Sequence, residues 1–156
     1  SSDLEQLSVL AEWLLAPDIY EFIQKGGSVS AFPKRYLPEL SALQSFVRIV
    51  QAGLEIAGQK GKDWIPAHAL AVSHALAPDA FPREEISYEQ AVAYLRKEAV
   101  TLSDAAPRGV VLLTYKNMPL GFVKNIGNRA NNLYPQEWRI RSGHLPEKPK
   151  IVMSYK

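Results

Sequence analysis

The chain has 156 residues, of which 47% are hydrophobic and 22% charged, and it contains no cysteine. This length provides one sizeable core or two small modules in contact. The lack of cysteine excludes disulfides, thiolate metal sites and cysteine nucleophiles. No stretch approaches the roughly 18 apolar residues of a membrane span, and no charged-then-apolar leader opens the chain. We therefore expect no membrane association. The first residue is Ser1 and not an initiator Met, so we also expect a fragment of a longer protein.

The formal net charge of +2 conceals a strong asymmetry along the chain. Residues 1–104 carry nine Lys and Arg against 14 Asp and Glu, whereas residues 105–156 carry nine against two. A cationic end favours a polyanionic partner such as nucleic acid. An ordinary basic tail would give the same count, so charge alone leaves both interpretations open.

The first half alternates helical and strand-like patterns. Ser2 and Glu5 form a capping box before a helix over residues 3–15. Glycines at 26 and 27 predict a turn between two short strands. Further strands, a hairpin loop and a second helix follow; the predicted ranges are strands 20–24, 29–32, 46–52 and 54–57, a connecting segment 40–46, loop 58–62 and helix 67–76.

The second half begins after the proline-bracketed stretch 78–82, the best candidate boundary between modules 1–78 and 79–156. Ser87 and Gln90 form a second capping box, which predicts a helix over residues 87–98. Its apolar face, Ala91, Tyr94 and Leu95, should pack on an interior strand at 110–113. Five further segments complete the expected order: turn 116–119, strand 120–125, loop 127–132 and strands 138–141 and 151–155.

Catalytic and metal-binding patterns are weak. His68 and His74 are six residues apart, which places them on different sides of a helix, and His144 is isolated in a Gly/Pro loop. We therefore interpret His68 as a hydrogen-bonding residue between segments. The loop 58–62 lacks the Ser or Thr of a P-loop, and no G-x-G-x-x-G occurs, so we interpret that loop as a solvated turn.

The basic end offers a more informative pattern. In residues 138–141 a two-residue period predicts Trp138 and Ile140 inward and Arg139 and Arg141 outward, at a spacing near that of successive phosphates. A core strand with solvated arginines is the plainer alternative. As an ensemble, the amide, guanidinium and aromatic groups of this end favour RNA; the candidate RNA-binding residues are Lys116, Lys124, Asn128, Arg129, Asn131, Tyr134, Arg139 and Arg141.

An ordered series of segments resembles the C-terminal region of bacterial Sun-type, RsmF-like RNA cytosine-C5 methyltransferases. The segments are residues 65–71, 88–99, 115–124 and 132–141, of which the Pro119-Leu120-Gly121 hairpin and the Tyr134-Pro135 to Trp138-Arg139 stretch are the specific pieces. The likeness is strongest over residues 64–142 and weaker over 14–63. It implies an α+β fold: a small α/β module followed by a PUA-like mixed pseudo-barrel that helps to hold ribosomal RNA.

In that family a preceding domain carries the S-adenosylmethionine site and two catalytic cysteines. This chain has no cysteine and no cofactor motif, so we expect it to be a non-catalytic, cofactor-free accessory part that positions rRNA. The resemblance implies two partners, ribosomal RNA and the methyltransferase domain of the same polypeptide, in the cytoplasm. A protein-docking module that contacts the catalytic domain or a ribosomal protein through exposed Trp13, Trp64 or Phe32 is the alternative.

Overall fold

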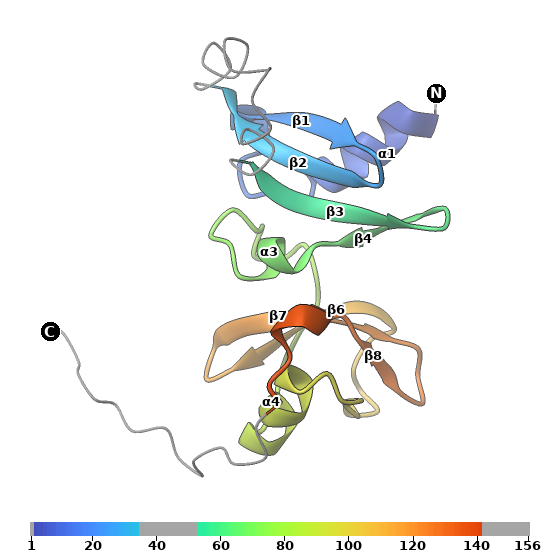
Figure 1. Ribbon diagram of the computed structural model, residues 1–156, viewed down its shortest axis with the longest axis vertical. Coiled ribbons are helices and arrows are strands. Elements are labelled where there is room, and N and C mark those ends of the chain that lie inside the picture. The colour runs from blue at the N-terminus through green and yellow to red at the C-terminus, as the bar shows by residue number, and fades with distance from the viewer. Residues whose placement is uncertain (1, 35–52, 142–156) are drawn as a thin grey trace, which may run out of the picture.

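The structure, a computed structural model, describes residues 2–34 and 53–141. Its first sheet is a four-stranded antiparallel meander in the order β1-β2-β3-β4 (Figure 1). The strands are β1 (Tyr20–Lys25), β2 (Ser28–Pro33), β3 (Leu54–Lys60) and β4 (Asp63–Pro66). The glycine turn between β1 and β2 is confirmed, with Gly26 at a positive φ of 58°. Strand β3 runs three residues beyond its predicted end, so the hairpin turn narrows to Gly61 and Lys62 and leads into β4, which was not predicted.

Two helices of this unit, α1 (Ser2–Ala11) and α3 (His68–Ala71), are shorter than the sequence predicted. Both end where the following backbone segments pair with each other. The Leu15 amide donates to Ala75 O and the Ala77 amide donates to Trp13 O, each at 2.8 Å. Helical periodicity continues through these residues, but the backbone hydrogen bonds go across the chain instead. A short 3₁₀ helix, η1 (Pro17–Ile19), then leads into β1.

The second sheet is mixed, in the order β5-β6-β7-β8, with β5 parallel to β6 and the other pairs antiparallel. The strands are β5 (Arg83–Glu85), β6 (Gly109–Tyr115), β7 (Met118–Asn125) and β8 (Ala130–Asn132). Lys116 and Asn117 both have positive φ, so a two-residue turn joins β6 to β7 and β7 begins earlier than predicted. Strand β8 lies where a loop over 127–132 was expected.

Helix α4 (Tyr88–Leu95) covers one face of the second sheet. The predicted capping box is confirmed: the Gln90 amide donates to Ser87 Oγ, and the Ser87 amide donates to Gln90 Oε1. The helix ends before the predicted residue 98 because Lys97 takes a φ of +65°. The Glu98 amide then donates to Ala93 O and the Lys97 amide to Tyr94 O, the bonding pattern of a Schellman motif.

The second sheet is buried on both faces. The helix-side core lies between α4 and the sheet and confirms the predicted packing, with Leu95 half-buried at its margin; its buried members are Ile86, Ala91, Tyr94, Val100, Val111, Leu113, Val123 and Ala130. The junction core lies between the two sheets; its buried members are Leu10, Leu14, Val29, Ala31, Ile56, Ala57, Leu70, Ala71, Leu76, Leu112 and Phe122. Because the junction core takes residues from both halves, they pack as neighbours, with α3 between the sheets and α4 on the far side (Figure 1).

The predicted strand at 138–141 is wrong. A 3₁₀ helix, η4 (Gln136–Trp138), follows Pro135, and residues 139–141 form no strand. Trp138 is exposed, at 60%, whereas Ile140 is half-buried and both flanking arginines are exposed as predicted. The predicted segments 40–46, 46–52 and 151–155, and His144, lie outside the described residues, as does the side chain of Ser2, so the first capping box stays a prediction. No helix in the described part of the chain is long and apolar enough to cross a membrane.

Candidate nucleic-acid interface

Four of the predicted RNA-binding residues lie on β7, on the edge strand β8 and in the loop between them. Lys124 on β7 is the cross-strand partner of Asn131 on β8, so both side chains project from the same face of the sheet. Asn128 and Arg129 lie in the loop just before β8, and both are exposed. Strand register, which the sequence did not reveal, therefore brings a cation and an amide group together beside this exposed loop.

Arg139 and Arg141 lie near the other end of β8, toward the face of the sheet that α4 covers, whereas Lys124 and Asn131 project from the opposite face. The Ile140 amide donates to Leu95 O at 2.8 Å, which places the two exposed arginines beside the C-terminal end of α4. That helix end also contacts β8, because Asn132 Nδ2 donates to Tyr94 O at 2.8 Å and to Glu98 O at 2.9 Å. The expected strand spacing of the guanidiniums does not apply, since the segment is not a strand.

Lys116 does not join this group. Its turn lies at one end of the β6–β7 hairpin, and the loop with Asn128 and Arg129 lies at the other end. An eight-residue strand separates the two ends, which is about 25 Å of strand rise. Lys116 instead lies near its neighbour, with Nζ 5.6 Å from the centroid of the Tyr115 ring.

Tyr134 belongs to an aromatic cluster between the two sheets. Its ring meets His68 at a centroid distance of 5.1 Å and 89°, and His68 in turn meets Trp138 at 5.4 Å and 82°. Tyr134 also lies 5.5 Å from the buried ring of Tyr94. The edge-to-face geometry is favourable for aromatic pairs, and it fixes the segment after β8 against α3 and α4.

His68 lies between segments as predicted, but its contacts are aromatic. Its Nδ1 is buried and has no hydrogen-bond partner in the described part of the chain. Burial lowers the pKa of His68 below its ordinary value, so the neutral imidazole is favoured. No group of three or more potential ligands for a metal ion occurs among the described residues. His74 is exposed and lies outside this cluster.

Lys97 and Lys60 are two cations that the sequence reasoning did not place at the site. Lys97 Nζ donates to Asn132 O at 2.7 Å and to Tyr134 O, so it anchors the chain where β8 ends. Burial lowers the pKa of Lys97; nearby Glu137 raises it, and the positive charge of Lys60 lowers it further. Lys60 is exposed on the β3–β4 hairpin, which the sequence assigned to solvent.

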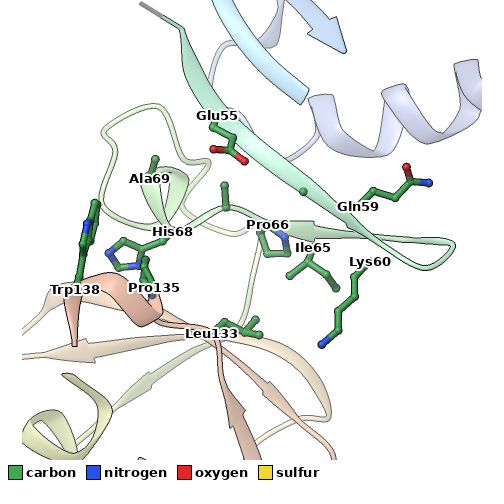
Figure 2. A pocket seen from close by; sticks show the side chains of 12 residues that line it. Glu55, Gln59, Lys60, Ile65, Pro66, His68, Ala69, Leu133, Pro135 and Trp138 are labelled. Carbon is green, nitrogen blue, oxygen red and sulfur yellow. The ribbon is translucent and has the colours of Figure 1, made fainter. Parts of the chain in front are cut away.

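Lys60 borders a pocket of about 510 Å³ between the β3–β4 hairpin and residues 133–138. Figure 2 shows His68 between Trp138 and Pro135, and Lys60 extending from the hairpin toward the second sheet. The pocket walls come from β3, β4, the start of α3 and the segment after β8; the lining residues are Glu55, Gly58, Gln59, Lys60, Ile65, Pro66, Ala67, His68, Ala69, Leu133, Pro135 and Trp138.

Arg108 is a further cation that the sequence reasoning missed. A Cβ on Gly127 would lie 2.8 Å from Arg108 Nη2, so this guanidinium lies against the loop that contains Asn128 and Arg129. The hairpin explains the proximity, because Gly109 at the start of β6 pairs with Asn125 at the end of β7. Correct pairing of the two predicted strands would have revealed it.

A family model and several known proteins match the part of the chain that contains this interface. Residues 81–140 match the family model described as the methyltransferase RsmF PUA domain. Ribosomal RNA small subunit methyltransferase F of Shigella flexneri is 31% identical over 106 residues, which is 68% of this chain and 22% of that protein. The proteins of the same name from Citrobacter koseri and Cronobacter sakazakii are 32% and 28% identical, over 78% and 88% of this chain and 24% and 27% of theirs.

The chain thus spans about a quarter of the length of these relatives. The mixed sheet with its capped helix occupies the matched residues, and the hairpin with Pro119 and Gly121 lies at its centre. The α+β architecture that the resemblance implied is confirmed. The division at residue 78 stays a prediction. Residues 81–140 form a PUA-like domain of the RsmF type.

Proposed function

We propose that this chain is the RNA-binding accessory region of an S-adenosylmethionine-dependent rRNA cytosine-C5 methyltransferase. In this proposal it positions structured rRNA for a methyl-transferring domain outside these residues. The observation that carries the proposal is the match of residues 81–140 to an RsmF PUA domain. The names of the curated relatives, which describe methyltransferases of small-subunit ribosomal RNA, support the substrate class.

The charge of the PUA-like region supports an RNA partner. Residues 105–141 contain six Lys and Arg against a single acidic residue, Glu137. We call the cations around β8, which are Lys124, Arg129, Arg139 and Arg141, the β8 side. Its three arginines are exposed, and the Arg108 guanidinium lies against the adjoining loop. Cations arranged in this way neutralise phosphates, and each contact releases counterions and so strengthens binding at low salt.

The methyl-transferring domain would supply the remaining chemistry. We propose that it holds S-adenosylmethionine and the cysteine that attacks the pyrimidine ring, since this chain has no thiol. The accessory region then contributes affinity and orientation for the rRNA. We also place the protein in the cytoplasm, where an enzyme of this class meets ribosomal RNA.

The protein-docking alternative now rests on different residues. Phe32 is buried, Trp13 packs on Phe81 at 5.2 Å, and Trp64 Nε1 donates to Gln6 Oε1, so the three aromatic residues expected to dock are engaged within the chain. Exposed apolar side chains do occur in the first 25 residues: Val9, Leu15, Ile19 and Ile23. They favour contact of this end with the methyl-transferring domain, which is compatible with RNA binding by the other end.

Filter binding with small-subunit rRNA tests the proposal. Between about 50 and 200 mM salt, six to ten phosphate contacts would lower the affinity by roughly 10³–10⁵-fold, and fewer contacts proportionately less. Polyglutamate is the control for unspecific attraction to a polyanion. Weak, salt-independent binding to rRNA, or equal binding to polyglutamate, would contradict the proposal; the first result is what a protein-docking module predicts.

A further inference from the structure

We propose that the pocket between the β3–β4 hairpin and residues 133–138 accepts one unstacked RNA base. The base stacks on Trp138, and a phosphate further along the same strand contacts Lys60, which lies at the opposite end of the pocket (Figure 2). The inference deepens the proposed function and rests on it, because it names the part of the RNA that this region recognises. None of the eight residues predicted from the sequence is assigned to this pocket.

The pocket has the size and composition of a small-molecule site. Its volume of about 510 Å³ is within the range of roughly 300–1,000 Å³ that is usual for such sites. Apolar walls come from Ile65, Pro66 and Leu133, while Lys60 and Glu55 provide charges of opposite sign at its border. A pocket that combines apolar walls with a few polar groups suits a flat heteroaromatic ligand with a charged substituent.

Trp138 provides the stacking surface. Its large aromatic side chain is 60% exposed. His68 at 82° and Tyr134 at 70°, with centroid distances of 5.4 and 6.5 Å, hold the indole by edge contacts. A tryptophan that is oriented by its neighbours yet largely open to solvent is a typical platform for an unpaired base.

The polar groups at the border favour particular bases. The Glu55 carboxylate accepts hydrogen bonds only, so it favours a base with an exocyclic amino group, such as cytosine, over uracil. Lys60 is also suited to bind phosphate. Its positive charge repels that of Lys97 and lowers the Lys97 pKa, and a phosphate beside Lys60 would offset this repulsion. The pocket therefore combines apolar walls with two charged groups, which suits a nucleotide.

The experiment compares three RNA oligomers of about ten nucleotides: oligo(C), oligo(U) and an abasic ribose-phosphate chain. Binding is followed by fluorescence anisotropy. All three carry the same phosphate charge, so electrostatics alone predicts equal affinities. Stacking of one base predicts roughly tenfold weaker binding of the abasic chain. If the Glu55 carboxylate accepts a hydrogen bond from the cytosine amino group, oligo(C) should bind more tightly than oligo(U). Glu55→Ala should remove this difference.

Two variants block the pocket by independent means. Trp138→Ala removes the stacking surface from an exposed position. Gly58→Leu fills the pocket: Gly58 is the cross-strand partner of Ile65, which also lines the pocket, and a Cβ there meets nothing closer than Gly27 O at 3.9 Å. Both variants should lose the preference for oligo(C) over the abasic chain. Circular dichroism and urea midpoints close to those of the parent confirm that they fold.

Lys60→Ala has a matched control two residues away. Lys62 is exposed on the same hairpin and does not line the pocket, so Lys62→Ala removes an equal charge without touching the site. We expect Lys60→Ala to weaken oligo(C) binding several-fold more than Lys62→Ala does. Equal effects of the two substitutions would overturn the phosphate contact at Lys60.

The outcomes separate this inference from the proposed function. If the parent binds rRNA with strong salt dependence but binds oligo(C) and the abasic chain equally, RNA binding stands and the base pocket is overturned. If Trp138→Ala impairs binding of the purified methyl-transferring domain and leaves the oligo(C) preference intact, the pocket binds protein and the inference is wrong. If the parent binds neither rRNA nor any oligomer, both proposals are overturned together.

Discussion

The Tyr94 hydroxyl donates to Phe122 O at 2.9 Å and so joins the C-terminal end of α4 to the centre of β7. Gly121, next to Phe122, makes this contact possible: a Cβ there would lie 2.1 Å from the hydroxyl oxygen and 3.0 Å from His68 Nδ1. Burial and the neighbouring Tyr134 raise the pKa of Tyr94, which keeps the hydroxyl protonated as a donor. The Pro-Leu-Gly hairpin of the sequence thus has a packing role.

Gly121→Ala should destabilise the chain, because the added methyl group would displace the Tyr94 hydroxyl and push against His68. We expect a loss of about 1–3 kcal/mol in the free energy of unfolding, measured by urea denaturation. Gly58→Ala is the control, since its Cβ would meet only Gly27 O, at an ordinary contact distance of 3.9 Å, and its φ is not positive. Equal stability of Gly121→Ala and the parent would show that the close approach is not constraining.

Leu95→Ala should cost less than a fully buried leucine does. Leu95 is half-buried at the margin of the helix-side core, whereas Leu113 at its centre has no exposed surface. Truncation of a fully buried Leu costs about 2–5 kcal/mol, so Leu113→Ala should fall in this range and Leu95→Ala below it. The reverse order in urea denaturation would mean that α4 packs with a different face.

Features that depend on local chemistry were predictable from the sequence. The Ser87–Gln90 capping box and the glycine turn between β1 and β2 need only neighbouring residues, and the structure contains both. The buried face of α4 followed from helical periodicity. Helix ends were poorly predicted where distant backbone competes, as at Leu15 and Ala77, because a periodic pattern contains no information about cross-chain hydrogen bonds.

At the candidate site, too, the local pattern of the sequence did not reveal contacts between distant segments. Alternation of Trp138 to Arg141 predicted a strand, yet Pro135 starts a 3₁₀ turn and the aromatic ring faces solvent. The exposure of Arg139 and Arg141 was predictable because solvation of arginine does not depend on the backbone conformation. Lys60 and Arg108 were missed since each joins the interface only through the pairing of strands that are separate in sequence.

Stability should fall as the pH is lowered below about 6.5, the ordinary pKa of histidine. Burial lowers the pKa of His68 in the folded state, so at mildly acidic pH the unfolded chain binds more protons and unfolding becomes easier. Urea midpoints at pH 7.5 and about 5.5 measure the effect. His68→Gln should reduce the loss, whereas the exposed His74→Gln should behave like the parent. A parent midpoint that is independent of pH over this range would contradict the prediction.

The isolated chain should transfer no methyl group. Addition to carbon 6 of the pyrimidine ring needs a thiolate, and the sequence contains no cysteine. The measurement is incorporation of label from S-adenosylmethionine into rRNA by the purified chain, with a full-length relative as the positive control. Incorporation above background would show that a different nucleophile acts here and would contradict the accessory role.

The β8 side should account for most of the salt dependence of rRNA binding. If Lys124, Arg129, Arg139 and Arg141 each neutralise one phosphate, a variant with all four replaced by Ala should change the slope of log K against log salt. The change should be about 3 units, at roughly 0.7 per contact with single-stranded RNA.

A matched variant replaces four other exposed cations, and so removes an equal charge from elsewhere on the molecule; these are Lys25, Lys34, Lys62 and Lys116. It should retain most of the parent's slope, because these residues lie on the first sheet and at the far end of the β6–β7 hairpin. Filter binding across a salt series, with both variants folded by circular dichroism, makes the comparison. Equal changes in slope would mean that net charge and not the β8 side attracts the RNA, whereas a larger change in the matched variant would move the interface to the first sheet.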